Sequence, residues 1–529
     1  MDNLGQNNSY LKVWVVLSRM FKNFFNKNTN NTNTNTNTNT KEQINTIIDR
    51  AKKSSDFTFI SLASNKEKLI IYYYKTLIDS EILKRDFLPY IKPKADQIKT
   101  LQELSSYIPL EQMIITDDVL EINSRLNQGS VLIQLHKDDK IVLMVDLSAI
   151  TKGYRQTNDT ENEFSVVGPK VGFIENIGTN LYLLRQNIVS SNLIFEEITI
   201  GSLSKTKVVL AYIDGVTNPQ YVNTARQRLS EVDFDAVFDS SNLEQAISDN
   251  SNTPFPVLLT TERVDRATYA LLIGQVAILV DGSPYVITGP TTLLDFFISP
   301  EDYFLPWIVG SFFRVIRLLG VIFSVFATPV YVAVMTFHYE VIPQDLLGPL
   351  ISSRSNVPFP PILEVIFLEL TIELLREAGA RLPNKIGQTL GIVGGIVIGQ
   401  ASVEAALTSS VLLIVVALSA LASFTTPIFK MSNTIRIIRF PFILLAAIWG
   451  GLGIAIGLVF LLAHLLRIKS LGNPYLVPIF PFRSNDYADS VIRSSFEIMK
   501  KRPSYLRPLL MSKYQPKKNK DVKEGINNE

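Results

Sequence analysis

The chain has 529 residues, of which 47% are hydrophobic, and its formal net charge at pH 7 is +2. This length exceeds what one hydrophobic core supports and predicts two or three domains, while the near-neutral charge gives no electrostatic reason to expect nucleic acid as a partner. Because there is no cysteine and there are only three histidines, disulfides, thiolate metal sites and cysteine nucleophiles are excluded. The sequence also contains no Walker phosphate loop, GxSxG elbow or HExxH motif. We therefore expect no enzymatic activity, no cofactor and no bound metal.

The first 40 residues are predicted to be a disordered or amphipathic extension. An amphipathic stretch over residues 10–25 precedes an Asn/Thr alternation from Asn28 to Thr40. The alternation has no apolar side chains to offset the entropy of ordering. Because the stretch before it lacks the long apolar region and cleavage site of a secretory signal, we expect it to be a cytoplasmic extension.

Residues 41–162 are expected to form the first subdomain of a soluble α/β head. Up to about Leu126 the apolar residues recur at helical spacing, which predicts helices. Two β-rich runs follow, Val131–Leu135 and Ile141–Leu147, and the polar residues between them predict a hairpin with His136 in its turn.

The second α/β subdomain of the head is expected over residues 163–298. Its predicted elements are a helix around Ile174–Ile188, strands at Leu193–Ile200 and Val208–Ile213, a helix over Asn218–Leu229, and a hairpin that pairs Val276–Val280 with Tyr285–Thr288. The hairpin turns at Asp281-Gly282, since this dipeptide supplies the positive φ angles of a tight turn. At Ser299 the sequence Ser-Pro-Glu-Asp predicts a helix start, with a capping serine and proline in the first turn.

Residues 299–482 are expected to form an all-α polytopic membrane domain, and residues 483–529 a basic cytoplasmic tail. Four stretches lack Asp, Glu, Lys and Arg, namely 318–337, 386–403, 405–429 and 440–466. A helix rises ~1.5 Å per residue, so about twenty residues cross a hydrocarbon core ~30 Å thick, and we expect about four to six helices. Positive charges before the first stretch and in the tail favour the cytoplasm for both ends. Four crossings would satisfy this, but they would place either Arg381 and Lys385 or Arg436 and Arg439 on the opposite side, so the topology stays open.

The segment from Pro360 to Pro383 interleaves apolar and charged residues. At 100° per residue, one stripe of this predicted helix collects apolar and charged side chains, and Glu364 lies opposite. The stripe contains Ile362, Ile366, Glu369, Glu373 and Arg376. A charge at the membrane centre costs ~2.5 to 3.5 kcal/mol, and each large apolar side chain contributes only ~0.3 to 0.6 kcal/mol. The helix therefore cannot be fully exposed to lipid. It must lie at the interface, pack its polar stripe into other helices, or line water. At the interface, local ion pairs such as Glu373 with Arg376 would support it.

Glycines recur at every fourth position in two apolar stretches, which permits close approach of helix backbones. They are Gly391, Gly395 and Gly399 in one stretch, and Gly453 and Gly457 in the other. The partner of each glycine face can lie in the same chain or in a second copy of it.

Several short blocks, in this order and spacing, make the chain resemble the GerA family of spore germination receptor A subunits. They are Val167-Gly-Pro-Lys-Val-Gly-Phe-Ile-Glu175, Thr261-Glu-Arg263, Val280-Asp-Gly-Ser-Pro284, Glu301-Asp-Tyr303, and Leu374-Leu-Arg-Glu-Ala-Gly-Ala-Arg-Leu-Pro383 running into Gly394-Gly-Ile-Val-Ile-Gly-Gln400. The resemblance covers residues 167–481. Lys170 stands where the family usually has arginine, and Val264 where it often has proline.

The resemblance implies a nutrient-responsive receptor subunit in the spore inner membrane, with its head on the cytoplasmic side. Its implied partners are a transporter-like B subunit, a lipoprotein C subunit, further copies of itself and membrane lipid. The resemblance also implies an oligomeric channel-forming subunit. From the charged stripe and the glycine faces we expect a ligand-gated cation pathway, in which Ile362 and Ile366 form the constriction, Glu369 and Glu373 attract cations, and Arg376 neutralises part of the field. Two alternatives stay open: a secondary transporter of amino acids, although no internal repeat is detectable, and a membrane-anchored scaffold subunit.

Overall fold

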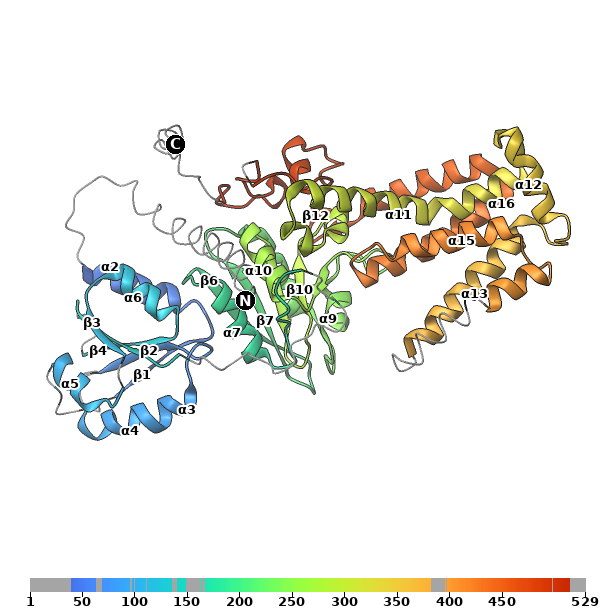
Figure 1. Cartoon of the computed structure of the whole chain (residues 1–529). Helices are drawn as coiled ribbons and strands as arrows, with labels where there is room; N and C mark the ends of the chain where they lie inside the picture. Colours follow the sequence, from blue (N-terminus) through green and yellow to red (C-terminus); the bar gives the residue numbers. More distant parts are fainter. Residues whose placement is uncertain are drawn as a thin grey trace, which may run out of the picture.

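The computed structural model describes residues 40–513, apart from 63–68, 96–97, 99, 111, 136–139, 149–162, 164–166, 382–394, 396 and 497. The predicted extension over residues 1–39, the His136 turn and Gly391 lie outside this range. Two five-stranded sheets with their helices form one end of the molecule, and a bundle of long helices forms the other (Figure 1).

The first sheet has its strands in the order β1-β2-β4-β5-β3, all antiparallel. The strands are β1 Phe57–Ser61, β2 Ile70–Tyr74, β3 Met113–Thr116, β4 Ser130–Gln134 and β5 Val142–Asp146. Helices α2 Thr40–Ala51 and α6 Val119–Leu126 cover one face, and α3 Ser80–Ile82, η1 Leu83–Phe87, α4 Leu88–Ile91, η2 Lys92–Lys94 and α5 Leu101–Tyr107 lie towards the other. The pairing of β4 with β5 confirms the predicted hairpin.

The helical interpretation of residues 41–126 is wrong in part, because three of these strands fall within it. Strand β2 explains the error. Its five residues, all apolar or aromatic, are buried on both faces of the sheet, so its sequence lacks the alternation that marks a half-buried strand. A short continuous apolar run of this kind is indistinguishable from a helical segment by periodicity.

The second sheet has the order β6-β7-β9-β10-β8 and is also antiparallel. Its strands are β6 Leu193–Ile200, β7 Thr206–Ile213, β8 Leu259–Thr261, β9 Val276–Val280 and β10 Val286–Gly289, and its helices are α7 Ile177–Asn187, α8 Pro219–Glu231, α9 Ser240–Ile247 and α10 Val264–Ile273. The two predicted helices, the two predicted strands and the β9–β10 hairpin are confirmed. Gly282 in the hairpin turn has φ +88°, as the Asp-Gly sequence requires.

A buried ion pair joins the two halves of the head. Arg185 of α7 donates to the Asp56 carboxylate through Nε and Nη2, both at 2.6 Å. Burial alone would raise the pKa of Asp56, but the Arg185 guanidinium and the hydroxyls of Ser54 and Thr76 hold that pKa below its usual value. The carboxylate therefore stays charged, and leaving either partner alone would strand a buried charge.

The helical end begins after Ser299, whose capping box with Asp302 is present as predicted. The capped turn, η4 Pro300–Tyr303, is short, and the long helix α11 Trp307–Thr336 begins after Pro306. The remaining elements are η3 Leu293–Phe297 before it, and η5 Tyr339–Val341, α12 Gln344–Arg354, α13 Pro361–Arg381, α15 Ser410–Ser423 and α16 Phe429–Arg467 after it. Residues 397–404 are also helical.

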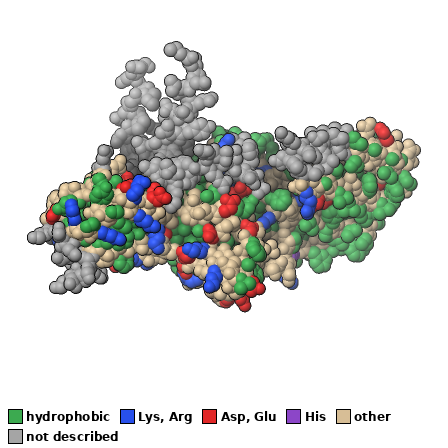
Figure 2. Space-filling view, turned by 90° about the horizontal axis from the view of Figure 1, so that it is seen from below, with side chains coloured by type: hydrophobic (Ala, Val, Ile, Leu, Met, Phe, Trp, Pro, Cys, Tyr) green, Lys and Arg blue, Asp and Glu red, His purple; other side chains and the backbone are tan. Residues whose placement is uncertain are grey.

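Among the described helices, two are long and apolar enough to cross a membrane by length and composition, α11 and α16. Helix α15 is apolar but has only 14 residues, and α13 carries the charges noted above. Figure 2 shows hydrophobic side chains dominating the surface of the helical end, whereas charged side chains of both signs are spread over the head.

Helix α16 reverses direction at Gly450, whose φ and ψ of 61° and −137° are not helical. Its first residues lie at the head, where Lys430 pairs with Glu244. Its last residues return there, since His464 Nε2 lies 2.9 Å from Thr253 Oγ1. The reversal itself lies at the far end of α11, where the Gly451 amide donates to His338 at 3.2 Å. Helix α16 is therefore a helical hairpin.

The chain after α16 packs against the head instead of forming a free tail over its described part. It contains β11 Lys469–Ser470, β12 Asn473–Pro474, η6 Ser484–Asp489 and η7 Ser504–Leu506. Tyr475 and Leu506 are fully buried in the same hydrophobic core as strands β7 and β9. Residues 483–513 were predicted to be a basic tail, but apolar side chains within this segment pack against the head.

Replacing Gly453 by alanine should destabilise the α16 hairpin. A Cβ at Gly453 would overlap the carbonyl oxygen of Leu445 on the opposite arm, and overpacking of this kind costs about 1–3 kcal/mol. The matched control is Gly379→Ala, because a Cβ at Gly379 meets nothing within 4 Å. Thermal unfolding in detergent measures both variants, and equal melting temperatures would contradict the tight hairpin.

Candidate functional site

Helix α13 turns two of its acidic side chains towards its own chain. Its exposed face is apolar over Leu363, Phe367, Leu370 and Leu374, and it ends in the exposed pair of Glu377 with Arg381. Glu364 and Glu369 are buried on the other side, at 0% and 5% exposure. Since a carboxylate without compensation is costly in an apolar surrounding, each needs a partner from another element.

Arg439 supplies the partner of Glu369 and links four helices. Its Nη1 donates to Glu369 Oε2 on α13 at 2.6 Å, and its Nη2 donates to Ser324 Oγ on α11 at 2.7 Å. The same Nη2 lies 3.5 Å from the Ser419 carbonyl on α15. Arg439 itself is 2% exposed.

Glu373 and Arg376 take different partners, one turn closer to the head. Glu373 Oε1 lies 3.4 Å from Arg436 Nη2, and the Glu373 side chain keeps 43% of its exposure. Arg376 lies over the Phe424 ring at 4.3 Å and 3.5 Å from Ser423 Oγ. The predicted local pair of Glu373 with Arg376 is thus replaced by contacts to other helices.

Glu364 was not expected on the packed side of α13, yet it is fully buried. Its carboxylate accepts a hydrogen bond from Arg354 Nη2 at 2.8 Å and another from the Ser409 amide at 3.1 Å. Sequence reasoning missed Arg354 and Arg439 as partners because they lie 10 and 70 residues away from the acids they neutralise. The acids within an apolar helix did indicate that basic side chains of other elements must pair with them.

The apolar residues of the predicted stripe pack inside the chain. Ile362 and Ile366 are half-buried against a small core that includes Val365, Leu412 and Ile443. The structure therefore packs this stripe of α13 against neighbouring helices of the same chain.

The predicted glycine faces also find contacts in the same chain, with one exception among those described. Gly453 and Gly457 pack against Leu445 and Phe442 on the opposite arm of α16. Gly399 faces Leu413, whereas a Cβ at Gly395 would meet nothing within 4 Å. The face of Gly395 is thus open in this chain.

A second buried network lies where the head meets α11. Arg314 donates to Asp302 Oδ2 at 3.2 Å and to the Asp489 carbonyl at 2.6 Å. The hydroxyls of Tyr269 and Tyr303 both donate to the Asp489 carboxylate, at 2.9 Å. Burial raises the pKa of both tyrosines, and the Asp489 charge raises it further. The tyrosines therefore remain neutral donors, and the network joins α10, α11 and the C-terminal segment.

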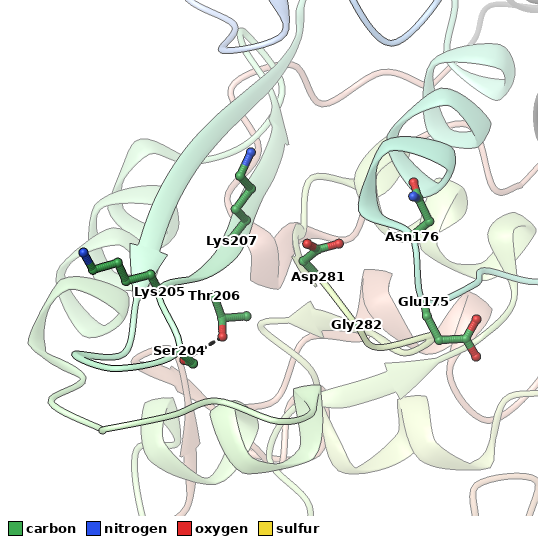
Figure 3. Close-up of a pocket in the computed structure, with 8 residues that line it drawn as sticks. All are labelled: Glu175, Asn176, Ser204, Lys205, Thr206, Lys207, Asp281 and Gly282. Atoms are coloured by element: carbon green, nitrogen blue, oxygen red, sulfur yellow. Dashed lines mark hydrogen bonds between the residues drawn. The ribbon is translucent and has the colours of Figure 1, made fainter.

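A hollow of the head with a volume of about 550 Å³ lies beside the β9–β10 turn (Figure 3). It is lined by Glu175, Asn176, Ser204, Lys205, Thr206, Lys207, Asp281 and Gly282. Its motif residues make structural contacts: the Asp281 carboxylate accepts from the Ile177 amide at 3.2 Å, and the Gly282 amide donates to the Glu175 carbonyl at 2.8 Å. Among the described residues, no group of three or more His, Asp or Glu is placed to hold a metal.

Residues 44–505 match the model of the Bacillus/Clostridium GerA spore germination protein family. The chain is 48% identical to spore germination protein GerQA of Bacillus cereus, over 90% of this chain and 94% of that protein. It is 37% identical to spore germination protein A1 of Bacillus subtilis, over 84% of this chain and 92% of that protein.

A crystal structure of the N-terminal domain of the A subunit of the Bacillus megaterium spore germinant receptor GerK3 is 28% identical to this chain. It covers 47% of this chain and 92% of that domain, with a TM-score of 0.36, which is too low to support a structural conclusion. The family match and the identity to full-length relatives confirm the resemblance seen in the sequence blocks. The chain belongs to the GerA family of spore germination proteins.

Proposed function

We propose that this chain is the A subunit of a nutrient-responsive germinant receptor in the spore inner membrane, and that several copies form a cation pathway that opens on germination. Membership of the GerA family of spore germination proteins and the 48% identity to GerQA support the first part. The charged inner face of α13 carries the second part. Ionisable residues inside apolar helices are costly and mark ion or substrate pathways.

Glu373 is the carboxylate that best fits the role of attracting cations. Glu369 is matched by Arg439 at 2.6 Å and is buried, so it is neutralised in this conformation. Glu373 lies 3.4 Å from Arg436 and is nearly half exposed. Its charge therefore reaches the surface of the bundle, where the proposed pathway would run between copies or along α13.

Ile362 and Ile366 are proposed as the apolar constriction on the same helix. They lie on the far side of Glu369 from the head, half-buried against other helices. An apolar constriction blocks ions until it widens enough to admit water. We propose that α13 moves away from this packing when the receptor opens.

The distribution of basic residues supports a cytoplasmic head. The helix ends next to the head carry Arg314, Arg317, Lys430, Arg436 and Arg467. Helix α13 runs from the far end, where Glu364 meets Arg354, towards the head, where Arg376 meets Ser423. In this direction Arg381 lies at the same end of the bundle as Arg436, which supports a cytoplasmic head because positive residues concentrate on the cytoplasmic side.

The proposed partners are a transporter-like B subunit, a lipoprotein C subunit, further copies of this chain and membrane lipid. The exposed apolar face of α13 and the uncovered Gly395 leave helix surface available for another copy or for lipid. Small residues on helix faces favour close helix association in membranes.

Ile366→Ala should open the pathway. In liposomes that contain the purified chain, we expect potassium or sodium flux to rise about tenfold over the unaltered chain, because the apolar constriction is widened. The control is Ile322→Ala, a lipid-facing position of α11, which should leave flux unchanged. Absence of flux in Ile366→Ala and also in Ile362→Ala would contradict the pathway.

Glu373→Gln, added to Ile366→Ala, should lower the preference for cations over anions several-fold, because one half-exposed negative charge is removed from the pathway. Reversal potentials across planar bilayers measure this preference. Glu377→Gln, which removes an exposed acid one turn away, is the control. An unchanged preference in the Glu373 variant would assign the selectivity elsewhere.

Arg439→Met should destabilise the bundle by about 3–5 kcal/mol, because it strands the Glu369 carboxylate in an apolar core. The double variant Arg439→Met/Glu369→Gln should recover much of this loss. Arg381→Met, which breaks an exposed pair with Glu377, should have little effect. Denaturant unfolding in detergent measures all three, and equal stability of the first and third variants would overturn the bracing role of Arg439.

A further inference from the structure

Residues 479–496, called here the C-terminal lobe, expose several large apolar side chains on their surface. Phe480, Phe482 and Phe496 are 60%, 73% and 52% exposed, and Ile479 and Ile492 are about half exposed. Soluble proteins scatter exposed apolar residues singly, whereas a cluster in one short segment marks an interaction surface.

The acids of this segment are turned inward. Asp486 is 8% exposed and accepts hydrogen bonds from the amide and hydroxyl of Ser504, both at 2.7 Å. Asp489 accepts from the two tyrosines of the junction network. Among the residues after the lobe that the structure describes, the exposed charges are basic, namely Lys501 and Arg507. The outer surface therefore combines aromatic side chains with positive charge.

The lobe is held at the start of α11. Arg493 Nη1 donates to the Leu305 carbonyl at 2.6 Å, and Ser311 Oγ donates to the Arg493 carbonyl at 2.7 Å. Ser311 lies seven residues before the charge-free stretch that begins at Leu318, which is ~10 Å along the helix. The hydrocarbon core is ~30 Å thick, and headgroups extend the bilayer to ~40–45 Å. The lobe thus stands near the headgroup level.

The exposed apolar surface of α11 continues at the same level. Trp307, Ile308 and Phe312 are 47%, 62% and 61% exposed beside the lobe, and Figure 1 shows the C-terminal segment alongside the start of α11. Aromatic side chains are enriched at this depth of membrane proteins. Aromatic groups beside lysine and arginine are typical of segments that bind anionic membrane surfaces.

We propose that the C-terminal lobe is a lipid-binding surface, which inserts Phe480, Phe482 and Phe496 into the headgroup region of the head-side leaflet and prefers anionic lipid. The proposal rests on the membrane embedding of α11 included in the proposed function. The lobe thereby fixes the height of the head above the membrane through its contacts with α11 and with the junction network.

Single-cysteine probes test the lobe, because the chain has no natural cysteine. The full chain carrying Phe482→Cys or Phe496→Cys is labelled with a fluorophore and reconstituted in liposomes with nitroxide-headgroup lipid as quencher. Phe59→Cys, on β1 of the first sheet and 57% exposed, is the soluble control, and Phe323→Cys on α11 is the embedded control. We expect the lobe labels to be quenched about threefold more than the Phe59 label.

The preference of the lobe for anionic lipid is tested by changing the lipid composition. Replacing part of the phosphatidylcholine by phosphatidylglycerol should increase quenching at Phe496→Cys, and adding Lys500→Glu/Lys501→Glu should remove that increase.

Three results would overturn the proposal, and each leads to a different conclusion about the lobe or α11. Quenching of the lobe labels at the level of Phe59→Cys, with Phe323→Cys strongly quenched, would leave the embedding intact and remove the lobe from the membrane. Weak quenching at all positions would also refute the embedding of α11. Labels shielded from both aqueous iodide and the lipid quencher, together with disulfide-linked dimers of the unlabelled Phe496→Cys variant, would assign the surface to a second copy of the chain.

Discussion

The ion pair between Glu369 and Arg439 lies where four helices meet, and the packing of the bundle depends on it. A buried carboxylate or guanidinium is strongly unfavourable alone. Here the guanidinium also donates to Ser324 and lies near the Ser419 carbonyl. One cation thus holds α11, α13 and α15 against the first arm of α16. Movement of α13 away from its neighbours would require this pair to separate or to travel together.

The acidic side chains of α13 that pair with other helices are of two kinds: buried acids with close basic partners, and one acid that stays partly exposed. Glu364 and Glu369 have close basic partners within the chain, and they brace the helix. Glu373 keeps much of its exposure and has a looser partner, so it is available for ions or water. The exposed face opposite is apolar, which suits lipid or a neighbouring helix. In a cation pathway, Glu373 would therefore contact ions, whereas Glu364 and Glu369 would remain paired with arginines.

The head and the bundle are joined by contacts that leave little independent movement at their boundary. Asp302 pairs with Arg314 and Arg317 of α11, and Asp489 accepts from Tyr269 in the head. The C-terminal segment supplies Asp489 and Arg493 to this boundary. A displacement of α10 would therefore act on the same carboxylate that contacts the start of α11. The C-terminal lobe, which contains Asp489 and Arg493, also exposes aromatic side chains at this level.

Local signals in the sequence were sufficient for much of the head and for the family. Asp281-Gly282 specified a hairpin because its backbone preferences are local, and the ordered blocks from Val167 to Gln400 specified membership of the GerA family. Two of the four charge-free stretches, 318–337 and 440–466, lie largely within the long helices α11 and α16. Strand β2 was missed because a strand buried on both faces has no alternation. The partners of Glu364 and Glu369, the reversal at Gly450 and the docking of residues 483–513 were decided by the tertiary structure. Each depends on residues distant in the chain, since an ion pair or a packed surface forms between elements whose mutual placement no local pattern records.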